Sequence, residues 1–120
     1  MRDRKELSIV SDQTGSPTYA RDLAEAIISI ARHKNAGIEH AGIYHYCNKG
    51  IISWFDFAEA IKQIEGLSCE LKPISSSDYP TPARRPNYSA LDTSSIEKEF
   101  NIQLKDWRDS LETCLSKIPA

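Results

Sequence analysis

The chain has 120 residues, of which 40% are hydrophobic and 27% are charged, and its formal net charge is −2. This length allows one domain or part of one, and the composition is typical of a soluble globular protein. The small net charge and the absence of any lysine or arginine run argue against binding to nucleic acid or to a membrane surface. The longest apolar-rich stretch, residues 23–31, contains Glu25 and is too short to cross a bilayer.

The cysteines and histidines do not predict a disulfide framework or a metal site. Cys47, Cys69 and Cys114 are odd in number and far apart, which favours reduced thiols in a cytoplasmic protein. No two of them have C-x-x-C spacing, and the three histidines are not spaced like zinc ligands. The charged start, residues 1–6, has no apolar core of the kind that a signal peptide needs.

The first half of the chain predicts a strand, a helix and a second strand. Residues 7–10 are a short apolar run, and residues 11–18 form a loop that Thr18 ends as a helix cap. A helix follows to about residue 34, because Leu23, Ile27 and Ile30 recur on one face. The segment 35–37 supplies a stop, and residues 42–47 favour a β-strand.

The second half predicts three helices and one strand. Ser53 and Asp56 form a capping box before a helix that Gly66 ends, and residues 70–74 form the third strand. Asp92 or Thr93 caps a short helix, and Asp106 caps the last one. The fold class is therefore α/β, with about three short strands and four helices. Three short strands make a thin sheet, which suggests that some of them extend a sheet formed by another part of a larger body.

A proline-flanked arginine loop is the most informative segment. In residues 79–87, Arg84 and Arg85 lie between Pro82 and Pro86, so the loop is stiff and not helical. The planar guanidinium group matches phosphate oxygens in a bidentate manner, and two of them on a rigid loop suit a diphosphate. The alternative is a solvated pair of arginines that form surface salt bridges.

Four segments resemble one family in order and spacing. Residues 12–24 (DQTGSPTYARDLA) and 79–92 (YPTPARRPNYSALD) resemble the corresponding segments of dTDP-4-dehydrorhamnose reductases. Residues 53–58 (SWFDFA) fit the piece between them, and residues 106–108 (DWR) fit the final helix. The resemblance covers nearly the whole chain and implies one domain, residues 1–120. That domain would be the carboxy-terminal substrate-binding portion of an extended short-chain dehydrogenase, a fold of the NAD(P)-binding Rossmann-like class.

Two hallmarks of that superfamily are missing from the sequence. No glycine pattern approaches the nucleotide fingerprint, and none of the five tyrosines is followed four residues later by lysine, as the catalytic Tyr-x-x-x-Lys pair requires. The resemblance thus implies that NADPH or NADH is used by the parent enzyme and held by residues outside this chain. We expect no catalytic residue, no bound cofactor and no turnover from the chain alone.

The resemblance also implies a substrate and a set of contacts. The ligand would be a dTDP-linked deoxysugar, and the substrate-binding residues would be Arg84, Arg85, Gln13, Tyr79 and Thr18. The loop that holds Gln13 and Thr18 has a second interpretation, as a plain turn and helix cap. Trp54 and Phe57 could stack on a ligand, but their helical spacing favours the core. We also expect a homo-oligomer or association with the nucleotide-binding half.

The sequence leaves two other functions open. One is a non-catalytic interaction or regulatory module of the same fold. The other is part of a different nucleotide-sugar epimerase or dehydratase, against which the PARRP segment argues. Glycosidase and serine-hydrolase chemistry are unsupported, because no paired carboxylates and no G-x-S-x-G turn occur.

Overall fold

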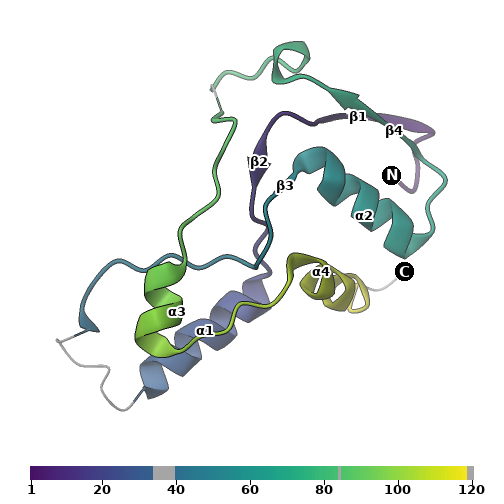
Figure 1. Ribbon diagram of the computed structural model, residues 1–120. Coiled ribbons are helices and arrows are strands. Elements are labelled where there is room, and N and C mark those ends of the chain that lie inside the picture. The colour runs from purple at the N-terminus through teal and green to yellow at the C-terminus, as the bar shows by residue number, and fades with distance from the viewer. Residues whose placement is uncertain (34–39, 84, 119–120) are drawn as a thin grey trace.

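The computed structural model describes residues 1–33, 40–83 and 85–118. Within these ranges it contains four α-helices and four short strands, together with one 3₁₀ turn (Figure 1). The elements in chain order are β1 (Glu6–Val10), β2 (Thr14–Gly15), α1 (Ala20–Arg32), β3 (Ile52–Ser53), α2 (Trp54–Glu65), β4 (Glu70–Ile74), the 3₁₀ turn η2 (Ser76–Asp78), α3 (Ser94–Phe100) and α4 (Trp107–Leu115). None of the described helices is long and apolar enough to span a bilayer. The α/β class and the four helices are confirmed.

The larger sheet consists of two parallel strands that helix α2 covers. β1 and β4 pair from Glu6 opposite Glu70 to Val10 opposite Ile74. Helix α2, which precedes β4 in the chain, packs on both strands. Pro73 stands opposite Ile9 and cannot donate to a ladder, as suits a strand at the edge of a sheet. Since each strand has a single partner here, both outer edges of the sheet are unpaired within the described part of the chain.

The smaller sheet is antiparallel, and the sequence did not predict it. Thr14 pairs with Ser53 and Gly15 with Ile52. The segment after the proline loop flanks β2, because the Thr14 amide donates to the Asn87 carbonyl at 2.8 Å and the Ser89 amide donates to the Thr14 carbonyl at 2.9 Å. Residues 12–15 are thus not a free loop.

The strand predicted at residues 42–47 is wrong. These residues form no strand, although their composition favours one. Tyr44 instead packs its ring against Phe100, at a centroid distance of 4.9 Å. The chain forms a backbone bridge only after this segment, between Lys49 and Asp106. A β-favouring composition does not make a strand when no partner strand lies alongside.

Most helix ends follow the predicted chemistry. The Ser53–Asp56 capping box forms, and Gly66 ends α2 in the left-handed conformation with φ 61°. Asp106 caps α4 by accepting from the Arg108 amide at 2.8 Å. At α3, Asp92 rather than Thr93 accepts the first free amide, that of Ser94.

Helix α1 departs from its prediction in two respects. Tyr19, not Thr18, is its N-cap residue, and no side chain of its own segment caps it. The Tyr19 amide instead donates to the side chain of Asn48 at 2.8 Å. The predicted core face is also exposed, since Ile27 is 57% exposed whereas Asp22 is buried.

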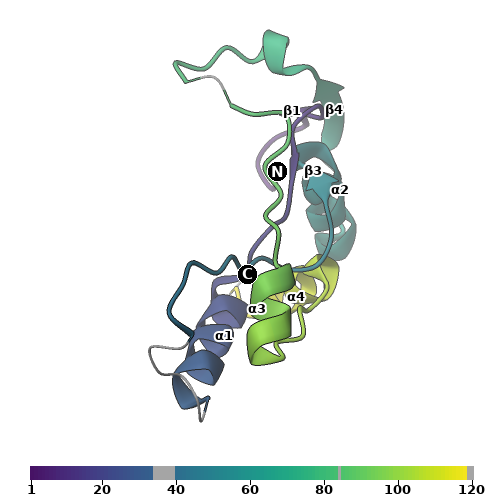
Figure 2. The ribbon, with the colours of Figure 1, turned by 60° about the vertical axis from the view of Figure 1, so that its left-hand side comes forward.

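The molecule is elongated and has a small apolar core. Its radius of gyration is 17.2 Å, against roughly 14 Å for a compact domain of this length. Figure 2 shows β1 and β4 near one end and α1 and α3 at the other. Among the described residues, the buried apolar side chains are Ala26, Cys47, Ala58, Ala60, Cys69, Ile96, Phe100 and Leu111. Several large apolar residues remain exposed, including Ile43 at 88%.

Candidate functional site

The loops that follow β1 and β4 are joined by one carboxylate. Asp12 accepts hydrogen bonds from the Ser76 hydroxyl at 2.6 Å, the Ser76 amide at 3.0 Å and the Ser75 hydroxyl at 3.2 Å. The hydroxyl of Ser76 and then its amide hold the pKa of Asp12 below the ordinary value. The carboxyl ends of the two parallel strands therefore form one connected edge, which is where ligand sites of α/β folds gather.

An open hollow of about 320 Å³ lies beside this edge. Its wall contains Gln13 from the first loop, with Tyr79 and Arg85 from the proline loop. The remaining lining residues are Ser8, Ile9, Val10, Trp54 and Thr81. The structure thus brings together three of the five residues that the sequence nominated for substrate binding. Whether they bind a ligand stays a prediction.

Arg85 is a cation placed at the rim of this hollow. Its side chain is exposed, and it makes no ion pair with another described residue. The surface salt bridge that was the alternative interpretation is therefore not found within the described ranges. Arg84 lies outside the described residues.

Both ends of the proline loop are fastened near the start of β2. Asp12 holds Ser75 and Ser76 before the loop, and Thr14 holds Asn87 and Ser89 after it. Asp12 and Thr14, which are separated by one residue, thereby fix the two ends of the segment that carries Arg85. Such anchoring reduces the entropy that the loop would lose when it binds a ligand.

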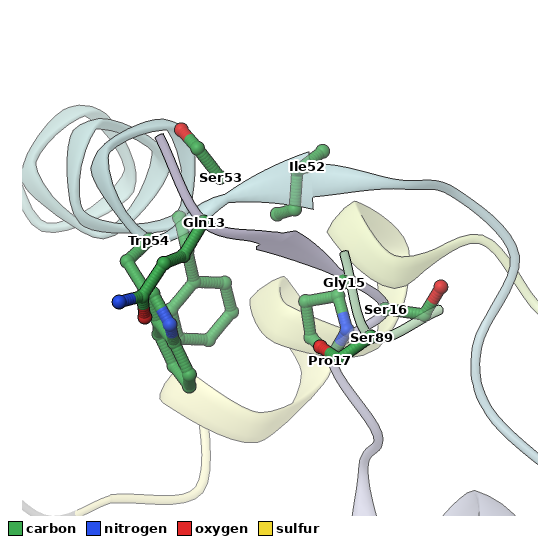
Figure 3. A pocket seen from close by; sticks show the side chains of 9 residues that line it. Gln13, Gly15, Ser16, Pro17, Ile52, Ser53, Trp54 and Ser89 are labelled. Carbon is green, nitrogen blue, oxygen red and sulfur yellow. The ribbon is translucent and has the colours of Figure 1, made fainter. Parts of the chain in front are cut away.

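A second, smaller hollow of about 110 Å³ adjoins the first (Figure 3). Gln13 and Trp54 line both. The other residues of its wall are Gly15, Ser16, Pro17, Ile52, Ser53, Phe57 and Ser89. Trp54 is 54% exposed, so the expectation that it belongs to the core is wrong, whereas Phe57 is half-buried against Trp107. Trp54 begins α2, and its side chain leaves the helix where the two hollows meet.

Thr18 lies apart from this group. It lines a third hollow of about 100 Å³ beside Asn48 and Trp107, and it faces neither of the first two. The structure therefore does not bring Thr18 together with Gln13, Tyr79 and Arg85.

A buried polar cluster, which sequence reasoning missed, holds the middle of the molecule together. Asn48 is 1% exposed and donates to Asp22 at 2.8 Å and to Ser110 at 2.9 Å. Ser110 and Lys105 also donate to Asp22, at 2.5 Å and 2.9 Å. The cluster joins the start of α1, the segment before β3 and the start of α4. The predicted turn Asn48-Lys49-Gly50 was its one signal in the sequence, and Gly50 adopts φ 118° there.

The electrostatics of this cluster favour its charged form. Burial raises the pKa of Asp22, but the hydrogen bonds from Ser110, Lys105 and Asn48 together outweigh burial and leave that pKa below its ordinary value. Hydrogen bonds to Glu25 and then to Asp22 raise the pKa of Lys105. Both groups therefore stay ionised at neutral pH, and the cluster holds the three segments together.

The described residues contain no group of three histidine, cysteine or acidic side chains placed to hold a metal ion. The nearest approach is His40, whose Nδ1 lies against the Glu99 carboxylate. His33 packs edge-on to His40 and to Phe100, so these histidines lie within an aromatic cluster.

Comparisons with known proteins identify the family of the chain. The family model described as RmlD substrate binding domain matches residues 1–119. The chain is 41% identical over 114 residues to the spore coat polysaccharide biosynthesis protein SpsK of Bacillus subtilis, covering 95% of this chain and 38% of that protein. It is 36% identical to a dTDP-4-dehydrorhamnose reductase of Burkholderia thailandensis, covering 95% of this chain and 42% of that protein.

Solved structures show the same relationship. The reductase of Bacillus anthracis, crystallised in complex with NADP, matches 97% of this chain and 40% of its own, with a TM-score of 0.87 and 31% identity. The reductase of Clostridium acetobutylicum matches 94% of this chain and 39% of its own, with a TM-score of 0.84 and 34% identity. The chain thus spans about two fifths of the length of these relatives. Sequence and structure together establish that the chain belongs to the RmlD substrate-binding domain family.

Proposed function

We propose that this chain is the part of a dTDP-4-dehydrorhamnose reductase that binds the dTDP-linked deoxysugar. The observation that carries the proposal is the convergence of Gln13, Tyr79 and Arg85 on one hollow at the carboxyl ends of β1 and β4. The names of the relatives supply the ligand and the reaction. In the whole protein the reaction is reduction of the 4-keto group of the sugar, which gives dTDP-L-rhamnose for cell-surface polysaccharide.

Two polar residues of the hollow have a chemical role in this proposal. The Arg85 guanidinium binds a phosphate of the diphosphate, because its planar fork can donate two parallel hydrogen bonds. The Tyr79 hydroxyl, on a side chain that is 59% exposed, is free to donate to the ligand. Thr18 and Arg84 are proposed as substrate contacts only because the chain resembles the reductase family.

The hydride source is NADPH or NADH, held by the nucleotide-binding half of the full-length enzyme. The Bacillus anthracis relative was crystallised with NADP, which supports a nicotinamide cofactor for the family. This chain has no Tyr-x-x-x-Lys pair and no glycine-rich fingerprint. It therefore binds substrate and positions it, and on its own it transfers no hydride.

The proposal also includes association with another chain and a location in the cytoplasm. The exposed apolar residues and the unpaired edges of β1 and β4 favour pairing with the nucleotide-binding half or with a second copy. Residues 1–120 act as one unit in this assembly. The three scattered cysteines favour the cytoplasm.

The test uses a full-length reductase of the family that carries this sequence as its matching segment. Arg85→Ala should raise the dissociation constant for dTDP about tenfold, because one charge-assisted hydrogen bond is worth about 1.5–3 kcal/mol. NADPH binding should stay unchanged, and Arg85→Lys should restore affinity only in part. Arg84→Ala tests the second arginine, and Arg32→Ala, on the exposed end of α1, is the matched control.

If both Arg84→Ala and Arg85→Ala bind dTDP as tightly as the parent, the loop does not contact the nucleotide. Tight dTDP binding without any sugar reduction by the full-length protein would favour the non-catalytic module instead.

A further inference from the structure

We propose that Asp12 and Ser76 fix the orientation of the Gln13 amide, so that its carbonyl oxygen accepts a hydrogen bond from the ring N3–H of a thymine or uracil base stacked on Trp54. The inference rests on the proposed function, since it assigns the base of the nucleotide to the wall where the two hollows meet. Gln13 is then a specificity-determining contact, and Asp12 and Ser76 are positioning residues.

The first step concerns the single proton of the Ser76 hydroxyl. Asp12 lies 2.6 Å from the Ser76 oxygen and also accepts the Ser76 amide. An ionised carboxylate can only accept, so the Ser76 proton is committed to Asp12. The lowered pKa of Asp12 keeps that carboxylate ionised at neutral pH.

The second step follows for Gln13. Ser76 Oγ has only lone pairs left, and Gln13 Nε2 donates to them at 2.9 Å. A flipped amide would set the Gln13 carbonyl oxygen against the Ser76 oxygen, with no proton between two acceptors. The chain of hydrogen bonds therefore allows one amide orientation, in which Gln13 Oε1 is the acceptor that remains for a ligand.

The third step is the surface beside that acceptor. Trp54 is 54% exposed and lines both hollows together with Gln13 (Figure 3). An exposed indole is a stacking platform for a nucleobase. The imide edge of thymine or uracil offers an N–H donor between two carbonyl acceptors, which complements an amide oxygen and its neighbouring N–H. Arg85 in the same hollow provides for the phosphates of the same nucleotide.

The experiment compares dTDP with N3-methyl-dTDP in the full-length reductase that carries this sequence. Isothermal titration calorimetry should give a dissociation constant about fivefold higher for the methylated nucleotide, because one hydrogen bond is lost. In Gln13→Ala the two nucleotides should bind equally. Ser76→Ala should lower the ratio and Ser76→Thr, which retains the hydroxyl, should restore it. Gln103→Ala, on the exposed surface outside both hollows, should keep the parent ratio.

The ratio of the two dissociation constants separates this contact from general damage, since a misfolded site weakens both nucleotides alike. Equal binding of the two nucleotides by the parent, or an unchanged ratio in Gln13→Ala, would overturn the inference while leaving the Arg85 result intact. Failure of the parent to bind dTDP at all would overturn the proposed function and this inference with it. Trp54→Ala should weaken both nucleotides about tenfold without changing their ratio, and undiminished binding would remove the base from this wall.

Discussion

Replacement of Asn48 by alanine should be among the most damaging changes in this chain. Asn48 and Cys69 are the largest side chains that are almost wholly buried among the described residues. The Asn48 side chain donates to Asp22 and Ser110 and accepts from the Tyr19 amide. It therefore joins α1 and α4 to the segment before β3, next to the backbone bridge between Lys49 and Asp106.

The expected loss follows from the bonds that alanine cannot make. The hydrogen bond to the ionised Asp22 is worth about 1.5–3 kcal/mol, and leaving the Tyr19 amide without a partner costs about 1 kcal/mol or more. The sum is roughly 2.5–4 kcal/mol of the free energy of unfolding. Most small domains have only about 5–15 kcal/mol in total, so the loss is a large fraction of their stability.

Urea unfolding followed by tryptophan fluorescence measures this loss. With a dependence on urea of about 1.5 kcal/mol per molar, the midpoint should fall by about 2 M. Asn48→Leu keeps the volume but loses the hydrogen bonds, so a similar fall would assign the effect to hydrogen bonds. Asn87→Ala, at an exposed asparagine, is the control and should change the free energy of unfolding by less than about 0.5 kcal/mol. A fall of the Asn48→Ala midpoint no larger than that of the control would refute the reasoning.

Three further predictions use the same protein. Gly50→Ala should cost about 2–4 kcal/mol, because φ is 118° and the new Cβ would lie 2.3 Å from the Trp107 ring; an unshifted urea midpoint would contradict this. The Asp22 pKa lies below 3.8 in the folded state, so its stabilisation is present above the unfolded-state value and is lost as the pH falls through the folded one. Asp22→Asn should therefore flatten the acid limb of the stability curve below roughly pH 5, and an unchanged slope would rule out Asp22 as its source. Exposed residues such as Ile43, at 88%, predict a dimer or larger assembly by light scattering, and a stable monomer at high concentration would argue against it.

The helix boundaries were predictable because their signals are local. Ser53 and Asp56 are three residues apart, and the glycine that ends α2 and the aspartate that begins α4 each act on their own turn. The strand at residues 42–47 was not predictable in the same way. Its residues favour an extended chain, but a strand forms only beside a partner strand. Tyr44 instead packs against the ring of Phe100.

The chemistry of the candidate site was visible in the sequence, whereas its construction was not. Arginines between prolines allow either a phosphate contact or a surface salt bridge, and the family resemblance favoured the phosphate contact, so Arg85 could be nominated from the sequence. The Asp12–Ser76 contacts join residues 64 positions apart, and the Ser110–Asp22 contact joins residues 88 apart. No local pattern encodes such separations. For the same reason Trp54 was assigned to the core, since helical spacing shows which face a residue shares but not what covers that face.

The position of Arg85 depends on residues that do not line the hollow. Asp12 fixes one end of the proline loop and Thr14 fixes the other. The pairing of β1 with β4 places Asp12, and the pairing of β2 with β3 places Thr14. Loss of either anchor would lengthen the free loop by a few residues, and the entropy lost on holding a guanidinium at the hollow would rise slowly with that length. The loop can therefore be stiff at its prolines and still misplace its cation. Rigid placement requires the two anchors, so the small sheets help to set the position of the cation that we propose binds a phosphate.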